Sequence, residues 1–426
     1  MDVLITPSPL KGTIKVPASK SILHRAIIAA SISNGTSIIR NINYSDDILR
    51  TIEAMKSLGV TFISENDTLT IVGNDAFELS NNLIDCHESG STLRFLIPLL
   101  SLANEAVTFT GRESLMKRPL ALYKSIFTKH KSTFKHNKNN VFIEGALRPG
   151  KYVVPGNISS QFITGLMLTL PLLSRSSTII VTEKFESKPY VDLTIDVLSK
   201  FGVTIEEGDD NTYYIKGRQS YVATDLTIEG DYSQAAFFMA MGLFNDEIKV
   251  LNLDHNSKQG DKEIVTIIKD FGGNITEIEG GYQVTRSELT STIVDIEQCP
   301  DLGPISTAIA CLADGTTDVK NAGRLRIKES DRLEAIQTAM NELGGFVLSD
   351  ADTLTIGGKP KLDGDGDVDS FKDHRIVMSV ASISTMCKKP FIIRDADSIN
   401  KSYPSFFDDF ISLGGNVKYI SGEIDE

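Results

Sequence analysis

The chain has 426 residues, 41% of them hydrophobic, which is enough for two or three domains with substantial cores. Its 43 Lys and Arg residues against 56 Asp and Glu residues give a net charge of −13, which argues against a nucleic-acid partner or an anionic-membrane partner. Four scattered cysteines without a CxxC pair argue against a zinc site or a disulfide framework. There is no signal-peptide pattern and no apolar run long enough to cross a bilayer, so we expect a soluble cytoplasmic protein.

Apolar helices are expected at a nearly constant interval along the chain. Their first residues would be Ser19, Ser89, Ser159, Ser233, Gly303 and Asp373, which are 70, 70, 74, 70 and 70 residues apart. A strand-like run rich in β-branched residues follows each helix, as in 177–183 and 389–395. This regular period predicts six copies of one structural unit.

A second helix, amphipathic in pattern, is expected in each unit. Five of these helices would end at a glycine that is followed by a strand pair: Gly59, Gly202, Gly272, Gly344 and Gly414. The sixth, ending near His130, lacks the glycine. Each unit therefore has the predicted order strand, buried helix, strand, amphipathic helix and strand pair, which is an α/β pattern with the helices on the inside.

The one irregular interval, 74 residues, falls in mid-chain and predicts two halves of three units each, meeting near residue 229. The segment TIKVPASKS before the first apolar helix is similar to LTIEGDYSQ before the fourth. Two pseudo-repeated domains with a cleft are the simplest interpretation. The expected strand at 3–16 could belong to either half.

The segment GRLRIKESDRLE at 323–334 is too highly charged to be a buried core. The apolar spacing after it predicts a helix that is capped by Ser330 or Asp331 and ends at Gly344. Lys328 and Arg332 would then lie at the positive end of a helix dipole, with Glu329 beside them. Such an end favours a bound anion by about 0.3–1 kcal/mol per charge.

Most other unusual polar residues also fall at expected helix starts. They are Lys20, Ser21, Asp47, Gly90, Ser91, Arg118, Ser160, Gln161, Tyr190, Gln234, His374, Arg375 and Lys401. If the units pack around pseudo-threefold axes, these helix starts converge and predict a site for one or two phosphates or carboxylates. Ser19, Ser89 and Ser159 alone would be explained as N-caps. Arg25 and Arg94 cannot be explained as helix caps, and a functional role is the better interpretation because charges on buried helices need partners.

Eight segments resemble the signatures of the EPSP synthase family, the 3-phosphoshikimate 1-carboxyvinyltransferases. They are SKSILHR (19–25), SGSTLR (89–94), MKRP (116–119), SSQF (159–162), SKPY (187–190), RIKESDR (326–332), DHR (373–375) and NKSYP (400–404). The resemblance implies an α/β (α+β) fold, a two-domain inside-out α/β barrel of six βαβαββ repeats. It also implies that the first strand joins the C-terminal half. The expected domains are then 1–18 plus 229–426, and 19–228.

The resemblance implies transfer of the enolpyruvyl group of phosphoenolpyruvate to the 5-hydroxyl of shikimate 3-phosphate, with release of phosphate. The residues that would hold shikimate 3-phosphate are Lys20, Ser21, Arg25, Ser159, Ser160, Ser187, Tyr190, Asp301 and Lys328. Those that would hold phosphoenolpyruvate are Lys20, Gly90, Arg118, Gln161, Arg332, Arg375 and Lys401. Asp301 would be the base near the 5-hydroxyl, and Glu329 or Lys20 the acid for the enol carbon.

Further expectations follow from the same resemblance. No metal and no cofactor would be needed, because cations and helix ends already offset the substrate charge. The enzyme would act as a monomer on its two small-molecule substrates. Arg324 stands where some family members have an asparagine that touches the shikimate ring, so no contact is assigned to it. Gly90, where an alanine would crowd phosphoenolpyruvate, leads us to expect sensitivity to glyphosate.

Three other interpretations were weighed against this one. A UDP-N-acetylglucosamine enolpyruvyl transferase would have Lys-Asn where this chain has Lys20-Ser21, and a cysteine in the loop that contains MKRP. A ligand-binding sensor that has lost activity would not require Lys20, Asp301, Glu329, Arg332 and Lys401 together. A nucleic-acid-end-modifying enzyme does not fit a net charge of −13.

Overall fold

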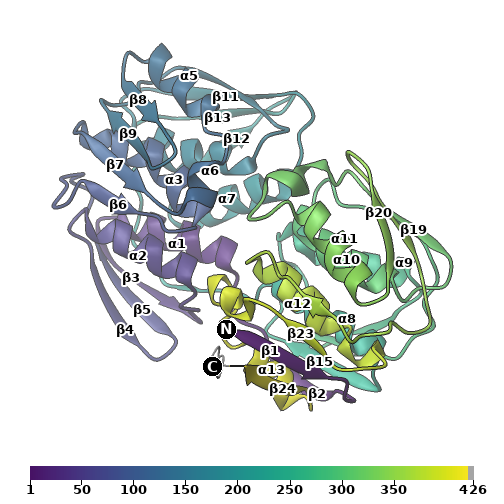
Figure 1. The fold of residues 1–426 in the computed structure, drawn as a ribbon. Helices are drawn as coiled ribbons and strands as arrows, with labels where there is room; N and C mark the ends of the chain where they lie inside the picture. Colours follow the sequence, from purple (N-terminus) through teal and green to yellow (C-terminus); the bar gives the residue numbers. More distant parts are fainter. Residues whose placement is uncertain (421–426) are drawn as a thin grey trace, which may run out of the picture. The chain divides into compact units, whose positions relative to one another are not determined.

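The computed structural model describes residues 1–420 (Figure 1). The chain divides into two compact units: unit 1 comprises Met1–Pro17 and the chain from Glu229 onward, and unit 2 comprises Ala18–Ile228. Each unit has a hydrophobic core of its own. Each also contains three four-stranded sheets, so the described chain has the six repeats that the 70-residue period predicts.

All six sheets share one strand order. The first two strands are parallel, and the last two run antiparallel to their neighbours. In five sheets the last two strands form a hairpin, whereas in the sixth they are β1 (Asp2–Thr6) and β24 (Asn416–Ile420), which are far apart in the sequence. In unit 2 the sheets are β14 (Leu226–Thr227), β3 (Gly35–Arg40), β5 (Thr68–Gly73), β4 (Thr61–Glu65); β6 (Leu83–Asp85), β7 (Val107–Thr110), β9 (Asn140–Glu144), β8 (Thr133–His136); and β10 (Lys151–Pro155), β11 (Ser177–Thr182), β13 (Thr212–Ile215), β12 (Ile205–Glu207).

Unit 1 repeats this arrangement. Its sheets are β2 (Lys11–Lys15), β15 (Glu247–Leu251), β17 (Gly281–Thr285), β16 (Asn274–Ile278); β18 (Ile293–Asp295), β19 (Thr316–Lys320), β21 (Leu354–Gly357), β20 (Phe346–Ser349); and β22 (Asp367–Val368), β23 (Phe391–Ile393), β1 (Asp2–Thr6), β24 (Asn416–Ile420). The expected strand at 3–16 is therefore two strands, and both belong to unit 1, where β1 pairs with β23 and β24.

The two similar segments before the first and fourth apolar helices exchange partners between the units. Strand β2 precedes the first apolar helix but pairs in parallel with β15 of unit 1. Strand β14 precedes the fourth but pairs in parallel with β3 of unit 2. Each segment thus supplies the first strand of a repeat whose remaining parts lie elsewhere in the sequence.

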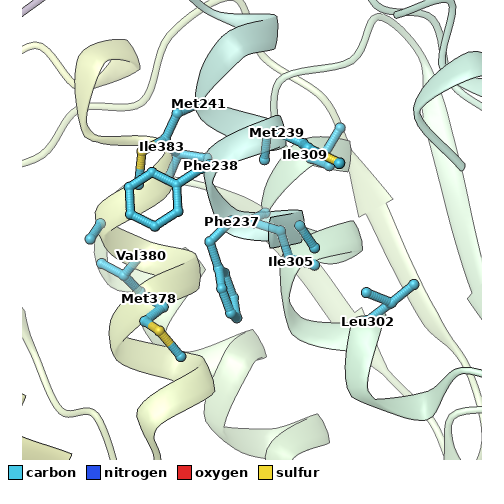
Figure 2. Packing of buried hydrophobic residues seen from close by; sticks show 14 of the residues in the cluster. Phe237, Phe238, Met239, Met241, Leu302, Ile305, Ile309, Met378, Val380 and Ile383 are labelled. Atoms are coloured by element: carbon cyan, nitrogen blue, oxygen red, sulfur yellow. The ribbon is translucent and has the colours of Figure 1, made fainter. Parts of the chain in front are cut away.

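The buried helices lie inside the sheets of each unit (Figure 1). They are α1 (Lys20–Ser31), α3 (Gly90–Leu100), α6 (Ser160–Thr169), α8 (Tyr232–Leu243), α10 (Gly303–Ala310) and α12 (His374–Ser382). In unit 1, apolar side chains of α8, α10 and α12 point toward one another, among them Phe237, Ile305 and Val380 (Figure 2). Nearly every residue of these helices is buried, so they are covered on all faces, and the few charged side chains on them need partners.

The outer helices carry the amphipathic pattern. They are α2 (Asp46–Lys56), α5 (Ala121–Lys129), α7 (Lys188–Lys200), α9 (Ile264–Asp270), α11 (Arg332–Glu342) and α13 (Phe406–Ser412), and a short α4 (Glu113–Met116) precedes α5. The predicted glycine ends are confirmed, since Gly59, Gly202, Gly272, Gly344 and Gly414 all have positive φ. In the repeat without a glycine, Lys131 takes the left-handed conformation, with φ of 60°.

The predicted N-caps are confirmed only in part. Ser89 accepts a hydrogen bond from the backbone N–H of Thr92, and Ser159 from that of Gln161. Ser19 precedes α1, but its hydroxyl makes no hydrogen bond to the first turn. Asp331 is the cap of α11, accepting from the N–H of Glu334, as the charged segment predicted.

Candidate active-site residues in the two units

In unit 1 the candidate residues gather around one carboxylate. Asp301 lies in a 3₁₀ turn (Pro300–Leu302) that leads into α10. Its Oδ1 is 3.2 Å from Lys328 Nζ and 3.0 Å from Arg332 Nη1, and its Oδ2 is 3.0 Å from Arg375 Nη2. Three cations from two repeats of the unit therefore contact a single carboxylate.

Arg332, the first residue of α11, is the most deeply buried of these cations, with 1% of its side chain exposed. Its Nε donates to Asp373 Oδ2 at 2.8 Å and its Nη2 to Asp373 Oδ1 at 3.3 Å. The same Nη2 is 2.6 Å from Glu329 Oε2, and Lys401 Nζ lies 3.9 Å from Glu329 Oε1. The guanidinium is therefore fixed in one orientation by carboxylates on several sides.

The charges of this cluster control one another's protonation. Burial alone would raise the pKa of Asp301, but Arg375, Lys328 and Arg332 outweigh it and hold that pKa well below its usual range. Burial lowers the pKa of Lys328, against the opposing effect of Asp301. The carboxylates Asp373, Glu329 and Asp301 outweigh burial at Arg332 and raise its pKa. Asp301 is therefore ionised at neutral pH and can accept a proton.

In unit 2 the corresponding buried cation is held by uncharged groups. Arg25, on α1, donates from Nε to Thr194 Oγ1 at 2.8 Å and from Nη2 to Thr164 Oγ1 at 3.2 Å. It also donates to the carbonyls of Ser21 and Tyr190, at 2.6 and 3.1 Å. Its side chain is 3% exposed, and burial lowers its pKa to about 10. Within residues 1–420, none of the hydrogen-bond acceptors of Arg25 is a carboxylate, so the charge of Arg25 is not offset by an ion pair.

The starts of α3 and α6 lie close together in unit 2. Arg94 Nη1 donates to Gln161 Oε1 at 2.7 Å, and Gln161 Nε2 donates to Ser91 Oγ at 3.1 Å. A Cβ atom added at Gly90 would lie 2.7 Å from Arg118 Nη1. Gly90, Gln161 and Arg118 are thus neighbours, as expected if they hold one anion, and the glycine leaves room for the guanidinium.

The remaining predicted residues of unit 2 lie at other helix starts. Lys20, the first residue of α1, pairs with Asp47 of α2 at 2.7 Å. Ser160 begins α6, next to its cap Ser159. Ser187 precedes α7 in a left-handed conformation, with φ of 59°, a strain that often occurs at functional positions. The carbonyl of Tyr190 accepts a hydrogen bond from Arg25, whereas within residues 1–420 neither Ser159 nor Ser160 is hydrogen-bonded to Arg25.

Sequence reasoning gave no role to two residues that orient predicted ones. Asp373 is fully buried and binds Arg332 with both oxygens. Asp47 is the ion-pair partner of Lys20. Both had visible signals, since Asp373 belongs to the DHR segment and Asp47 occupies the same position in its repeat as Arg118 and Arg332. The sequence does not show how the helices pack, and this packing brings Asp47 to Lys20 within one repeat and Asp373 to Arg332 between two repeats.

The family profile described as EPSP synthase (3-phosphoshikimate 1-carboxyvinyltransferase) matches residues 4–410. This chain belongs to the EPSP synthase family. It is 49% identical to a 3-phosphoshikimate 1-carboxyvinyltransferase of Clostridium perfringens over 420 residues, covering 98% of this chain and 99% of that protein. It is 47% identical to the one of Clostridium kluyveri over 417 residues, covering 97% and 98%.

Solved structures confirm the expected fold. An EPSP synthase from Acinetobacter baumannii matches with a TM-score of 0.83 and 24% identity, over 98% of this chain and 100% of that one. The enolpyruvyl transferase NikO from Streptomyces tendae matches with a TM-score of 0.80 and 14% identity, over 98% of both chains. The mixed α/β repeat architecture of enolpyruvyl transferases is therefore also that of this EPSP synthase family member.

Two properties of the described part of this family member bear on its partners. Within residues 1–420, none of the helices combines the length and the apolar character that a membrane crossing requires. In the same range, no three or more His, Cys, Asp and Glu side chains are grouped so that they could hold a metal ion. All four cysteines are free thiols that lie buried in the cores.

Proposed function

We propose that this protein transfers the enolpyruvyl group of phosphoenolpyruvate to the 5-hydroxyl of shikimate 3-phosphate and releases phosphate. Membership of the EPSP synthase family supports the reaction. The structural observation that carries the assignment of roles is the contact of Asp301 with three cations in unit 1. It supports these roles because a carboxylate that could accept a proton lies beside cations of the kind that attract phosphate and carboxylate.

The proposed reaction has two steps. In the addition, O5 of shikimate 3-phosphate forms a bond to C2 of phosphoenolpyruvate, Asp301 takes the hydroxyl proton, and Lys20 or Glu329 gives a proton to C3. In the elimination, the bond from C2 to the phosphate oxygen breaks, C3 loses a proton, and the carbon–carbon double bond returns. General acid–base assistance of this kind contributes roughly 10²–10⁴-fold.

The remaining residues would bind the two anions. Arg25, Ser21, Ser159, Ser160, Ser187 and Tyr190 of unit 2 and Lys328 of unit 1 would bind shikimate 3-phosphate. Gly90, Arg118 and Gln161 of unit 2 and Arg332, Arg375 and Lys401 of unit 1 would bind phosphoenolpyruvate, and Lys20 of unit 2 is assigned to both substrates. The support for Arg25 is that its buried charge is surrounded by neutral oxygens, an arrangement that an anionic ligand would stabilise.

The anions would also change the basicity of Asp301. While Lys328, Arg332 and Arg375 contact Asp301, its pKa is low and it is a weak base. A substrate carboxylate or phosphate that draws these cations away would raise that pKa. Proton removal would then be strongest when the substrates are bound.

The test is phosphate release from phosphoenolpyruvate by the purified protein, with shikimate 3-phosphate or UDP-N-acetylglucosamine as acceptor. Turnover with shikimate 3-phosphate alone is the expected result. Turnover with the sugar nucleotide would show that the acceptor residues are wrongly assigned. A folded protein that binds both ligands without turnover would be a sensor instead. We also propose that it acts as a monomer in the cytoplasm, which sedimentation analysis and cell fractionation would test.

A further inference from the structure

A chain of four buried side chains connects α1, α2 and α3 in unit 2. His24 Nδ1 is 2.8 Å from Thr51 Oγ1, Thr51 Oγ1 is 2.7 Å from Thr92 Oγ1, and Thr92 Oγ1 is 2.7 Å from Ser89 Oγ. All four residues are completely buried. The chain ends at the cap of α3, immediately before Gly90, and nothing in the proposed reaction uses it.

The hydrogen bonds of this chain can run in one direction only. Thr92 donates to Ser89, so its single hydroxyl proton is used there. Thr51 must therefore donate to Thr92, and the proton between His24 and Thr51 must come from Nδ1 of the imidazole. Burial is the main reason that the pKa of His24 falls to about 3, so the ring stays neutral at physiological pH.

Because the hydrogen bonds run in this direction, the hydroxyl proton of Ser89, the last of the four residues, is left to be donated. Ser89 Oγ accepts from both Thr92 Oγ1 and Thr92 N, at 2.7 and 3.2 Å. No acceptor for the Ser89 hydroxyl proton occurs among the hydrogen bonds of residues 1–420. A fully buried hydroxyl donor without an acceptor costs free energy unless a ligand satisfies it.

The surroundings of Ser89 indicate which ligand would accept. The next residue, Gly90, adjoins Arg118 Nη1, Arg94 Nη1 and Gln161 Oε1. The helix α3 begins at Gly90, so its first backbone N–H groups lie next to Ser89 in the sequence and are not used within the helix. An anionic oxygen is the acceptor that two guanidinium groups and a helix N-terminus favour.

We propose that Ser89 donates its hydroxyl proton to an anionic oxygen of phosphoenolpyruvate, and that His24, Thr51 and Thr92 are positioning residues that aim this proton. The proposal rests on the proposed function, because phosphoenolpyruvate is the anion assigned to Gly90, Arg118 and Gln161. Ser89 contacts the ligand in this scheme, whereas the other three act through it.

The experiment compares KM for phosphoenolpyruvate and for shikimate 3-phosphate in Ser89→Ala, Thr92→Val and Thr92→Ser. Loss of one hydrogen bond of about 1 kcal/mol corresponds to roughly a fivefold change. We expect Ser89→Ala to raise KM for phosphoenolpyruvate about fivefold or more, and Thr92→Val by a smaller factor. KM for shikimate 3-phosphate should stay within twofold, and Thr92→Ser, which restores the hydroxyl, should resemble the wild type.

The matched control is Thr169→Val on α6. Thr169 is also fully buried, and its hydroxyl donates within its own helix to the Gly165 carbonyl at 2.8 Å. It should lower the melting temperature about as much as Thr92→Val without changing either KM. If Ser89→Ala lowers the melting temperature but leaves KM for phosphoenolpyruvate unchanged, the four hydrogen-bonded side chains only stabilise the fold and the proposal is wrong.

The two proposals fail in distinguishable ways. No turnover of shikimate 3-phosphate by the wild type contradicts the proposed function. Titration calorimetry with phosphoenolpyruvate alone then still tests the role of Ser89, since Ser89→Ala must bind phosphoenolpyruvate more weakly than the wild type does. Equal affinities of the two proteins, or no binding by either, would overturn the proposal about Ser89.

Discussion

The two units share one repeat and one strand order, yet the most buried arginine of each, Arg332 in unit 1 and Arg25 in unit 2 among the described residues, is held in a different way. In unit 1, Arg332 is surrounded by Asp301, Glu329 and Asp373, so its charge is offset within the protein. In unit 2, Arg25 is nearly as buried, but all its hydrogen-bond acceptors are hydroxyl or carbonyl oxygens, and its guanidinium lies over the ring of Phe95. A cation paired internally must exchange partners to bind an anion, whereas a cation held by neutral dipoles needs the anion to complete its surroundings.

The largest effect is expected from Asp301→Asn, which removes the base but keeps its shape. We expect kcat to fall by roughly 10²–10⁴-fold, the usual contribution of general acid–base catalysis. Phosphate release under saturating substrates measures it. A loss of less than tenfold would contradict the role of Asp301 as base, although its place among the cations would stand.

The same variant tests the charge balance of unit 1 through pH. The folded-state pKa of Asp301 is held well below its unfolded value, so its ionised form stabilises the fold at pH values above the unfolded pKa of about 3.9. That contribution is lost as the pH falls through the folded pKa. Denaturant unfolding should therefore show Asp301→Asn less stable than the wild type at pH 7, with the difference shrinking in acid.

A pair of stability measurements would test the comparison between the units directly. Arg332→Gln leaves Asp373 buried without its cation and should lower the free energy of unfolding by about 3–5 kcal/mol. Arg25→Gln removes a buried charge that has no carboxylate partner among residues 1–420, and should cost less than about 1.5 kcal/mol. The free energy of unfolding is measured in urea. Equal decreases for the two variants would mean that the charges of Arg332 and Arg25 are offset in the same way, contrary to the structure.

Gly90→Ala tests the space at the start of α3 in unit 2. The new methyl would lie 2.7 Å from Arg118 Nη1, so the end of that flexible side chain must move. We expect KM for phosphoenolpyruvate to rise and inhibition by glyphosate to weaken, each by about tenfold, or ~1.4 kcal/mol. The melting temperature should hardly change. Glyphosate inhibition equal to that of the wild type would contradict the placement of the ligand beside Gly90.

Much of the fold could be predicted because it repeats. Six copies of a 70-residue pattern identified the buried helices, the amphipathic helices and their glycine ends without knowledge of any contact. The exchange of β2 and β14 was not visible in the same way, because strand pairing depends on hydrogen bonds between segments more than 180 residues apart. Only the resemblance to a family suggested where the first strand belongs.

The candidate site was predictable at the level of residue types but not of partners. Charges at helix starts pointed to Lys328, Arg332 and Arg375, because the N-terminal end of a helix favours a bound anion. That all three contact Asp301 depends on how the repeats of unit 1 pack. The Ser89 chain was hidden for the same reason, since three of its four members read as ordinary polar residues of helices.

The smallest effect is expected at the end of α5, where the two units differ in a helix cap. All three outer helices of unit 1 end at a glycine with positive φ, whereas in unit 2 Lys131 has φ of 60°. Because a side chain strains this conformation, Lys131→Gly should raise the free energy of unfolding by about 0.5–1 kcal/mol.

The reciprocal control is Gly202→Ala, at the equivalent position after α7. It should lower the free energy of unfolding by a similar amount, since the φ of Gly202 is +79° and the new Cβ would lie 3.0 Å from Val222. Urea unfolding of both variants measures this. If Lys131→Gly is instead less stable than the wild type, the lysine side chain stabilises the fold by more than the strain costs. The lysine in place of a glycine in this repeat would then be stabilising.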